Sequence, residues 1–104
     1  RVGLLHADCT RLPLEDGSVG MVVVDLPFGK KHKSEMPLSK LYELTLAELC
    51  RVVRGGGALV ALTTHKHLLS RVLRDEERWL PVARHELSFG GLTAYAIVVI
   101  RKDD

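Results

Sequence analysis

The stretch MVVVDLPFGK, residues 21–30, decides how this chain folds. A short apolar run rich in valine ends abruptly at the acid Asp25. The run is too short for a helix and lacks polar alternation, so it predicts a strand buried on both faces, as in a parallel sheet. Ligands of such sheets bind just beyond the carboxyl ends of the strands, which is where Asp25 stands.

The residues after this strand predict a rigid exit. Pro27 fixes its own φ and biases Leu26 away from the helical region. Gly29 permits a close approach that a Cβ would forbid. The turn therefore presents a carboxylate, backbone carbonyls and the ring of Phe28 to one small space. Such a space suits a planar group that bears an amine.

Asp25-Leu26-Pro27-Phe28 resembles the Asp/Asn-Pro-Pro-Tyr/Phe motif of class I S-adenosylmethionine-dependent amino-methyltransferases. With leucine in place of the first proline and Gly-Lys after it, the motif is most similar to the catalytic domain of THUMP-domain RNA guanosine methyltransferases. The resemblance implies an α/β fold with a Rossmann-like sheet, and S-adenosylmethionine as the cofactor. It makes these four residues catalytic: Asp25, which also borders the cofactor, and the Leu26 carbonyl orient the guanine amine, while Phe28 stacks on the flipped base.

A second segment of the resemblance lies upstream. Residues 2–6 predict a short strand, and Asp8 follows its end. By the resemblance, Asp8 accepts a hydrogen bond from the adenine amine of the cofactor, and the Cys9 backbone N–H faces a ring nitrogen. The alternative is that Asp8 or Thr10 simply caps a turn of helix.

A basic loop follows the motif, with Lys30, Lys31 and Lys33 at the rim of the proposed site. Lysines of this kind hold RNA phosphates without reading the base sequence. The alternative is a solvated loop without a ligand.

The rest of the chain predicts alternating helices and strands. Apolar residues at helical spacing predict a helix over 38–54, whose charged positions, including Glu48 and Arg51, face away from the core. Gly55-Gly56-Gly57 follow a helix and precede a strand, which excludes a phosphate loop and predicts a helix C-cap and turn. The further elements expected are a strand over 58–63, a helix from a Thr64 cap to about Asp75, and a hairpin of strands 82–89 and 92–101 joined by Gly90-Gly91.

Composition sets only loose bounds. The chain has 104 residues, a net charge of +2 and two cysteines, Cys9 and Cys50, without the spacing of a disulfide framework or zinc site. His65 and His67 lack obvious further ligands nearby, so we expect no metal. No apolar run approaches the length of a membrane span, and we expect no membrane partner.

The order strand, strand, helix, strand, helix, hairpin resembles the second half of the class I methyltransferase sheet, ending in its antiparallel hairpin. The sequence holds no glycine-rich loop for the methionine part of the cofactor and no acid for its ribose. We therefore expect residues 1–104 to be a partial methyltransferase domain, inactive alone. Two family strands lie between the strand at 2–6 and the strand at 21–25, so we expect a gap or an exposed edge there.

The implied reaction is methylation of a guanosine N(2) amine in structured RNA, either tRNA or small nuclear RNA, in the cytoplasm or the nucleus. A small zinc-binding activator subunit at the sheet edge is a further partner that the resemblance implies. Adenine or cytosine amino-methylation stays open, because each substrate presents a ring with an amine. A non-catalytic fragment that binds a partner, and a generic α/β domain with an incidental motif, also stay open.

Overall fold

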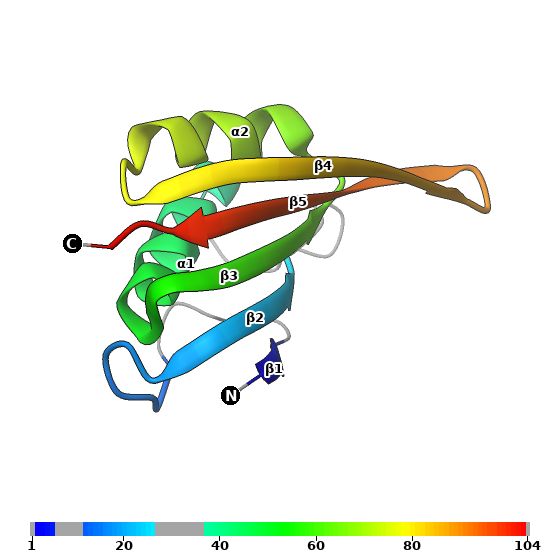
Figure 1. Cartoon of the computed structure of the whole chain (residues 1–104). Helices are drawn as coiled ribbons and strands as arrows, with labels where there is room; N and C mark the ends of the chain where they lie inside the picture. Colours follow the sequence, from blue (N-terminus) through cyan, green and yellow to red (C-terminus); the bar gives the residue numbers. More distant parts are fainter. Residues whose placement is uncertain (1, 6–11, 27–36, 104) are drawn as a thin grey trace.

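A computed structural model describes residues 2–5, 12–26 and 37–103. The strands and helices alternate as the sequence predicts, with small shifts at their ends (Figure 1). Their bounds are β1 Val2–Leu5, β2 Val19–Asp25, α1 Leu38–Val52, β3 Val53–Thr63, α2 Lys66–Asp75, β4 Trp79–Phe89 and β5 Leu92–Arg101.

All five strands form one sheet in the order β1-β2-β3-β5-β4. The strands β1, β2 and β3 are parallel, while β5 runs antiparallel to both β3 and β4. The predicted C-terminal antiparallel hairpin is therefore confirmed, and β4 lies at the edge, as expected. The helix α1 joins the parallel strands β2 and β3, as in the βαβ unit of α/β folds.

Of the expected gap or exposed edge at the first strand, the gap is wrong, whereas β1 does lie at an edge of the sheet. The strand β1 pairs directly with β2, from Val2 opposite Met21 to Leu5 opposite Val24. Unpaired backbone N–H and C=O groups along a strand edge are costly, so two such edges pair when no other strand separates them. The parallel part of the sheet is therefore continuous from β1 through β2 to β3.

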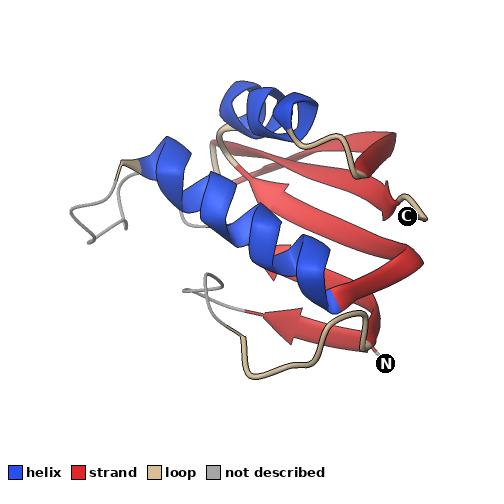
Figure 2. Ribbon diagram, turned by 90° about the vertical axis from the view of Figure 1, so that its left-hand side faces the viewer, coloured by secondary structure: helices blue, strands red, loops and turns tan. Residues whose placement is uncertain are grey.

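Both helices cover the same face of the sheet (Figure 2). Val22 and Val24 of β2 point into this layer and are buried, together with Leu46 and Leu49 of α1. On the other face Met21 is 36% exposed, and no described helix covers it. The prediction that this strand is buried on both faces is therefore wrong for the described residues.

The predicted role of the three glycines is also wrong. The helix α1 ends at Val52, and the next residue, Val53, is already extended at φ −80°, with its N–H bonded to the Leu49 carbonyl. Val53 pairs with Val19, whereas Ala58 pairs with Met21, so β3 bulges against β2 across the glycines. Gly56 takes φ +81° in this bulge, a conformation that glycine adopts at little cost.

Gly57 packs too closely for any side chain. A Cβ there would lie 2.8 Å from the Gly20 carbonyl oxygen and 2.9 Å from the Arg54 carbonyl oxygen. We expect Gly57→Ala to lower the free energy of unfolding by about 1–3 kcal/mol, because the backbone must move. Chemical denaturation measures this loss. The matched control is Gly55→Ala, whose Cβ meets the flexible Asp103 side chain; equal losses in both variants would contradict the account.

The second helix begins later than predicted. Its N-cap is His65 rather than Thr64, and the helix is not capped by a side-chain hydrogen bond. The Thr63 hydroxyl instead accepts the His65 N–H at 2.9 Å, which shifts the turn one residue along the chain. The apolar residues Leu69, Val72 and Leu73 form its inward face and are buried. Among the described helices, neither is long and apolar enough to cross a membrane.

The β4–β5 hairpin continues past the carboxyl ends of β2 and β3 as an arm (Figure 1). Thr63, the last residue of β3, pairs with Tyr95, and the residues closer to the turn have no partner in β3. Gly90 and Gly91 turn the chain with φ +57° and +76°. Two successive positive φ angles match the twist of a tight hairpin, as the paired glycines predict.

Candidate active site at the carboxyl edge of the sheet

Asp25 is the last residue of β2, and its side chain is exposed at the carboxyl edge of the parallel strands. The next residue is held firmly. The Leu26 N–H donates to the Leu62 carbonyl at 2.9 Å, and the Leu26 side chain is only 1% exposed. The strand exit is therefore fixed through both its backbone and its side chain, beside a free carboxylate. A fixed acceptor at this edge can orient a hydrogen-bond donor.

A buried hydroxyl pair lies beneath this exit. The Tyr42 hydroxyl of α1 and the Thr63 hydroxyl of β3 are 2.8 Å apart, and both side chains are buried. Burial raises the pKa of Tyr42, the hydrogen bond with Thr63 opposes this, and the charge of Asp25 raises the pKa further. The charge of Asp25 thus acts on the floor of the site. Tyr42 is one of the residues at helical spacing in 38–54, and nothing in the sequence pairs it with Thr63, so this role was not predicted.

The raised pKa of Tyr42 predicts a stability change at alkaline pH. Above about pH 10 the unfolded chain loses the phenol proton while the native protein keeps it, so the free energy of unfolding falls as the pH rises. Tyr42→Phe should cost about 0.5–1.5 kcal/mol at neutral pH and lack this part of the alkaline loss. Urea unfolding at pH 8 and at pH 11 measures both effects.

Tyr95→Phe provides the matched control, because Tyr95 is only half-buried and Tyr42 remains in place. We expect this variant to keep the alkaline loss of the unsubstituted protein. An alkaline loss in Tyr42→Phe as large as that of the unsubstituted protein would contradict the assignment.

A cation and an aromatic ring flank the floor on the hairpin side. The Lys66 ammonium lies 4.7 Å from the centroid of the Tyr95 ring. Tyr95 pairs with Thr63 in the sheet, so this contact stands directly beside the Tyr42–Thr63 hydroxyl pair. This cation–π contact joins Lys66, at the start of α2, to Tyr95 of β5.

Arg51 and Glu48 form a hydrogen-bonded pair that also binds the chain upstream of β2, and we call this pair the Arg51–Glu48 clasp. Arg51 donates to the Glu48 carboxylate at 2.7 and 2.8 Å, and to the backbone carbonyls of Leu14 and Leu12 at 2.8 and 3.1 Å. Glu48 in turn accepts the Leu12 N–H at 2.7 Å, and Asp16 pairs with Arg51 at 2.8 Å. Glu48 and Arg51 lie outside the buried core, as predicted, but their contacts with this segment were missed. They hold the segment that follows the proposed adenine contact.

Several predicted site residues lie outside the described residues. These are Asp8, Cys9, Pro27, Phe28, Lys30, Lys31 and Lys33, whose roles stay predictions. Of the predicted site, the structure places Asp25 and Leu26. It also shows that Cys50 is buried as a packing residue. Among the described residues, no group of three histidine, cysteine or acidic side chains could hold a metal ion.

The sequence matches the profile of the RMKL-like methyltransferase domain, also called UPF0020, over residues 1–94. The chain belongs to this family. The match covers the parallel strands, both helices and most of the hairpin. The solved structures described below confirm the predicted Rossmann-like class I methyltransferase fold.

Curated relatives within the methyltransferases are RNA enzymes. The chain is 36% identical over 103 residues to a Bos taurus protein named tRNA (guanine(6)-N(2))-methyltransferase THUMP3. It is 42% identical over 71 residues to a Mus musculus protein named U6 snRNA (guanine-N(2))-methyltransferase THUMPD2. These alignments cover 97% and 65% of this chain but only 20% and 13% of the relatives. The chain therefore spans about a fifth of the relatives' length or less.

Solved structures show the same methyltransferase fold. TrmN from Thermus thermophilus superposes with a TM-score of 0.74 at 25% identity, over 93% of this chain and 27% of that one. A methyltransferase from Methanosarcina mazei superposes with a TM-score of 0.72 at 11% identity, over 94% of this chain and 66% of that one. The second likeness concerns the fold alone.

Proposed function

We propose that this domain forms the amine-binding half of an S-adenosylmethionine-dependent RNA guanine N(2)-methyltransferase. The single observation that carries the proposal is the fixed strand exit. The Asp25 carboxylate is exposed at the carboxyl edge, next to a Leu26 backbone that its hydrogen bond to Leu62 holds in place. Family membership and the names of the curated relatives support the same reaction and the same class of substrate.

The chemistry required of these residues is mostly orientation. The Asp25 carboxylate and the Leu26 carbonyl accept hydrogen bonds from the exocyclic amine and aim its lone pair. An N–C bond then forms as the S–C bond breaks; the bonding pair stays on the sulfur, and the amine loses one proton to Asp25 or to water. Aligned reacting groups and a fixed negative charge lower the barrier without covalent catalysis by the protein.

The charge of Asp25 at this edge is complementary to that of S-adenosylmethionine. S-adenosylmethionine supplies an electrophilic methyl group on a positively charged sulfur, and the exposed Asp25 carboxylate complements such a charge. In this proposal Asp8 and Cys9 hold the adenine, and the Arg51–Glu48 clasp positions the chain at Leu12, three residues after Cys9. The cofactor contacts from glycine-rich and ribose-binding segments come from elsewhere in the protein.

The RNA contacts extend the same site. Phe28 stacks on the target base after Pro27 has turned the chain, and Lys30, Lys31 and Lys33 hold flanking phosphates. Aromatic stacking contributes about 1–3 kcal/mol per base, and lysine contacts make binding dependent on salt. Transfer RNA and small nuclear RNA both fit this proposal, which leaves the cytoplasm and the nucleus as compartments.

The zinc-binding activator subunit implied by the resemblance would add at a sheet edge. In the described residues the two edges are β1 and β4. The short β1 continues the parallel part of the sheet beside the proposed cofactor segment, so it is the edge at which a partner strand could stabilise that segment.

Calorimetry with S-adenosylmethionine tests the cofactor part of the proposal. We expect binding by the full-length protein and no measurable binding by residues 1–104 alone, because the glycine-rich loop is absent from this stretch. Asp25→Ala in the full-length protein serves as the internal comparison, with weakened binding expected. Binding by neither protein would contradict the proposal and favour the non-catalytic alternative.

A further inference from the structure

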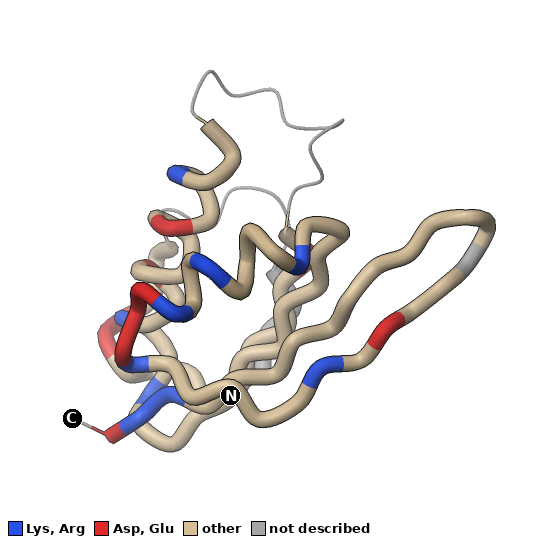
Figure 3. Tube along the Cα trace, turned by 90° about the horizontal axis from the view of Figure 1, so that it is seen from above, with Lys and Arg blue, Asp and Glu red and all other residues tan. Residues whose placement is uncertain are grey.

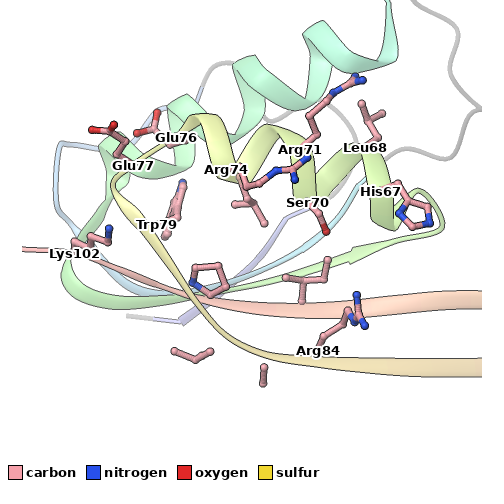
Figure 4. A pocket seen from close by; sticks show the side chains of 15 residues that line it. His67, Leu68, Ser70, Arg71, Arg74, Glu76, Glu77, Trp79, Arg84 and Lys102 are labelled. Atoms are coloured by element: carbon pink, nitrogen blue, oxygen red, sulfur yellow. The ribbon is translucent and has the colours of Figure 1, made fainter.

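A groove of about 1100 Å³ lies between α2 and β4, on the helix-covered face of the sheet (Figure 4). Its floor is apolar, with Leu73, Pro81 and Ile97 among the lining residues. Figure 4 shows Arg71 and Arg74 on the α2 side and Arg84 across from them, on β4. The proposed active site uses none of these side chains.

The groove is lined by cations without partners. Within the described part of the chain, no hydrogen bond or ion pair engages the side chains of Arg71, Arg74, Arg84 or Lys102. Arg78 already engages one of the two acids in the lining, Glu76, at 3.1 Å. In Figure 3 the basic positions are spaced along α2, while the acidic segments gather at its end, before β4. The longer part of the groove is therefore positively charged.

The floor also contains a donor without an acceptor. Trp79 is 2% exposed, and among the described residues its indole N–H has no hydrogen-bond partner. An indole nitrogen can only donate, and a buried donor without an acceptor is costly. This N–H is buried beneath the groove, so the ligand is indicated by the unpaired cations: one rich in anionic oxygens.

The groove starts beside the proposed active site. The helix α2 begins at Lys66, three residues after Thr63 in the floor of the site, and His67 lines the groove at this end. From there Arg71 and Arg74 follow one and two turns along the helix. A strand whose reacting base lies at Asp25 can therefore continue along α2.

We infer that this groove binds the phosphate backbone of the substrate RNA on one side of the target nucleotide. The inference rests on the proposed function and extends it to a surface outside the motif. Regularly spaced negative charge satisfies the three arginines, while the exposed apolar residues Pro81 and Val82 accept the flat faces of bases. An acidic peptide would satisfy the arginines but would leave these apolar residues without a matching group.

Salt-dependent binding of the full-length protein to an unmodified tRNA transcript tests the inference. The variant Arg71→Gln/Arg74→Gln/Arg84→Gln should bind about 10²-fold more weakly at 0.1 M salt, with a slope of log K against log salt smaller by about 2–3, since each lost phosphate contact removes roughly 0.7–0.9. The KM for RNA should rise while kcat stays unchanged. The single variants Arg74→Gln and Arg54→Gln form a matched pair, and only the first should weaken RNA binding. Arg54 is also an exposed arginine, but it lies at the start of β3, at the end of the strand away from the site.

The outcomes separate this inference from the proposed function. If the unsubstituted protein neither binds nor methylates RNA, the proposed function fails and the groove has no RNA to hold. If the protein methylates RNA and the triple variant keeps the same slope and KM, the groove inference alone is overturned.

Discussion

Asp25→Ala in the full-length protein should lower methyl transfer to RNA by about 10²–10³-fold or more, because the transition state loses its fixed acceptor. The fold should stay intact, since the Asp25 side chain is exposed at the end of β2 and supports no packing. An exposed substitution of this kind changes stability by about 0.5 kcal/mol or less. Single-turnover transfer of a labelled methyl group, alongside thermal unfolding, measures both quantities.

The comparison variant for this experiment is Asp75→Ala, which removes an exposed aspartate at the far end of α2. It changes the net charge of the protein by the same amount, and it should keep the activity of the unsubstituted protein. Full activity in Asp25→Ala would remove this residue from the catalytic machinery and with it the proposed role of the motif.

Leu26→Ala should lower the free energy of unfolding by about 2–5 kcal/mol, since a fully buried leucine side chain is replaced by a cavity. The substitution keeps the backbone N–H that donates to Leu62, so the loss reports side-chain packing alone. This leucine stands where the family motif has its first proline. A proline there would have no N–H to donate, so this chain holds its strand exit by a contact that the commoner motif lacks.

Leu80→Ala is the matched control for packing, because Leu80 is 49% exposed on the edge strand β4. Denaturant unfolding of the two variants should show a large loss for the first and a loss below about 1 kcal/mol for the second. Similar losses in both would mean that Leu26 does not anchor the exit.

The sequence predicted the elements that depend on local pattern. The valine run before Asp25, the helical spacing after Leu38 and the paired glycines at 90–91 each favour one conformation, and each element is present. The fold class followed from their order together with the motif. Neighbouring residues dictate these features, so they can be predicted without knowing which distant residues meet.

Features that depend on distant contacts could not be predicted. The Arg51 guanidinium reaches carbonyls at Leu12 and Leu14, almost forty residues away in the chain, so the helical spacing that turned it away from the core could not reveal these contacts. Gly57 is required by the Gly20 carbonyl across the sheet, which no local pattern reveals. The pairing of β1 with β2 likewise depends on which strand edges are left without a partner.

The residues of the site likewise divide into those that a local motif predicts and those that depend on distant contacts. Asp25 and Leu26 were found from the motif, whereas the buried Tyr42–Thr63 hydroxyl pair and the basic groove along α2 arise only when the helices dock on the sheet. Tyr42 had the spacing of an ordinary core residue. Arg71 and Arg74 had the spacing of a solvated helix face, and only the opposing strand β4 turns that face into a groove.

The most direct test of the central claim is nucleoside analysis of RNA after incubation with the full-length protein and labelled S-adenosylmethionine. Digestion and mass spectrometry identify which base carries the new methyl group, with Asp25→Ala as the negative control. We predict label in N(2)-methylguanosine from a tRNA or U6 small nuclear RNA transcript, lost in the variant. Label in methylated adenosine or cytidine instead, or N(2)-methylguanosine formed equally by Asp25→Ala, would contradict the account.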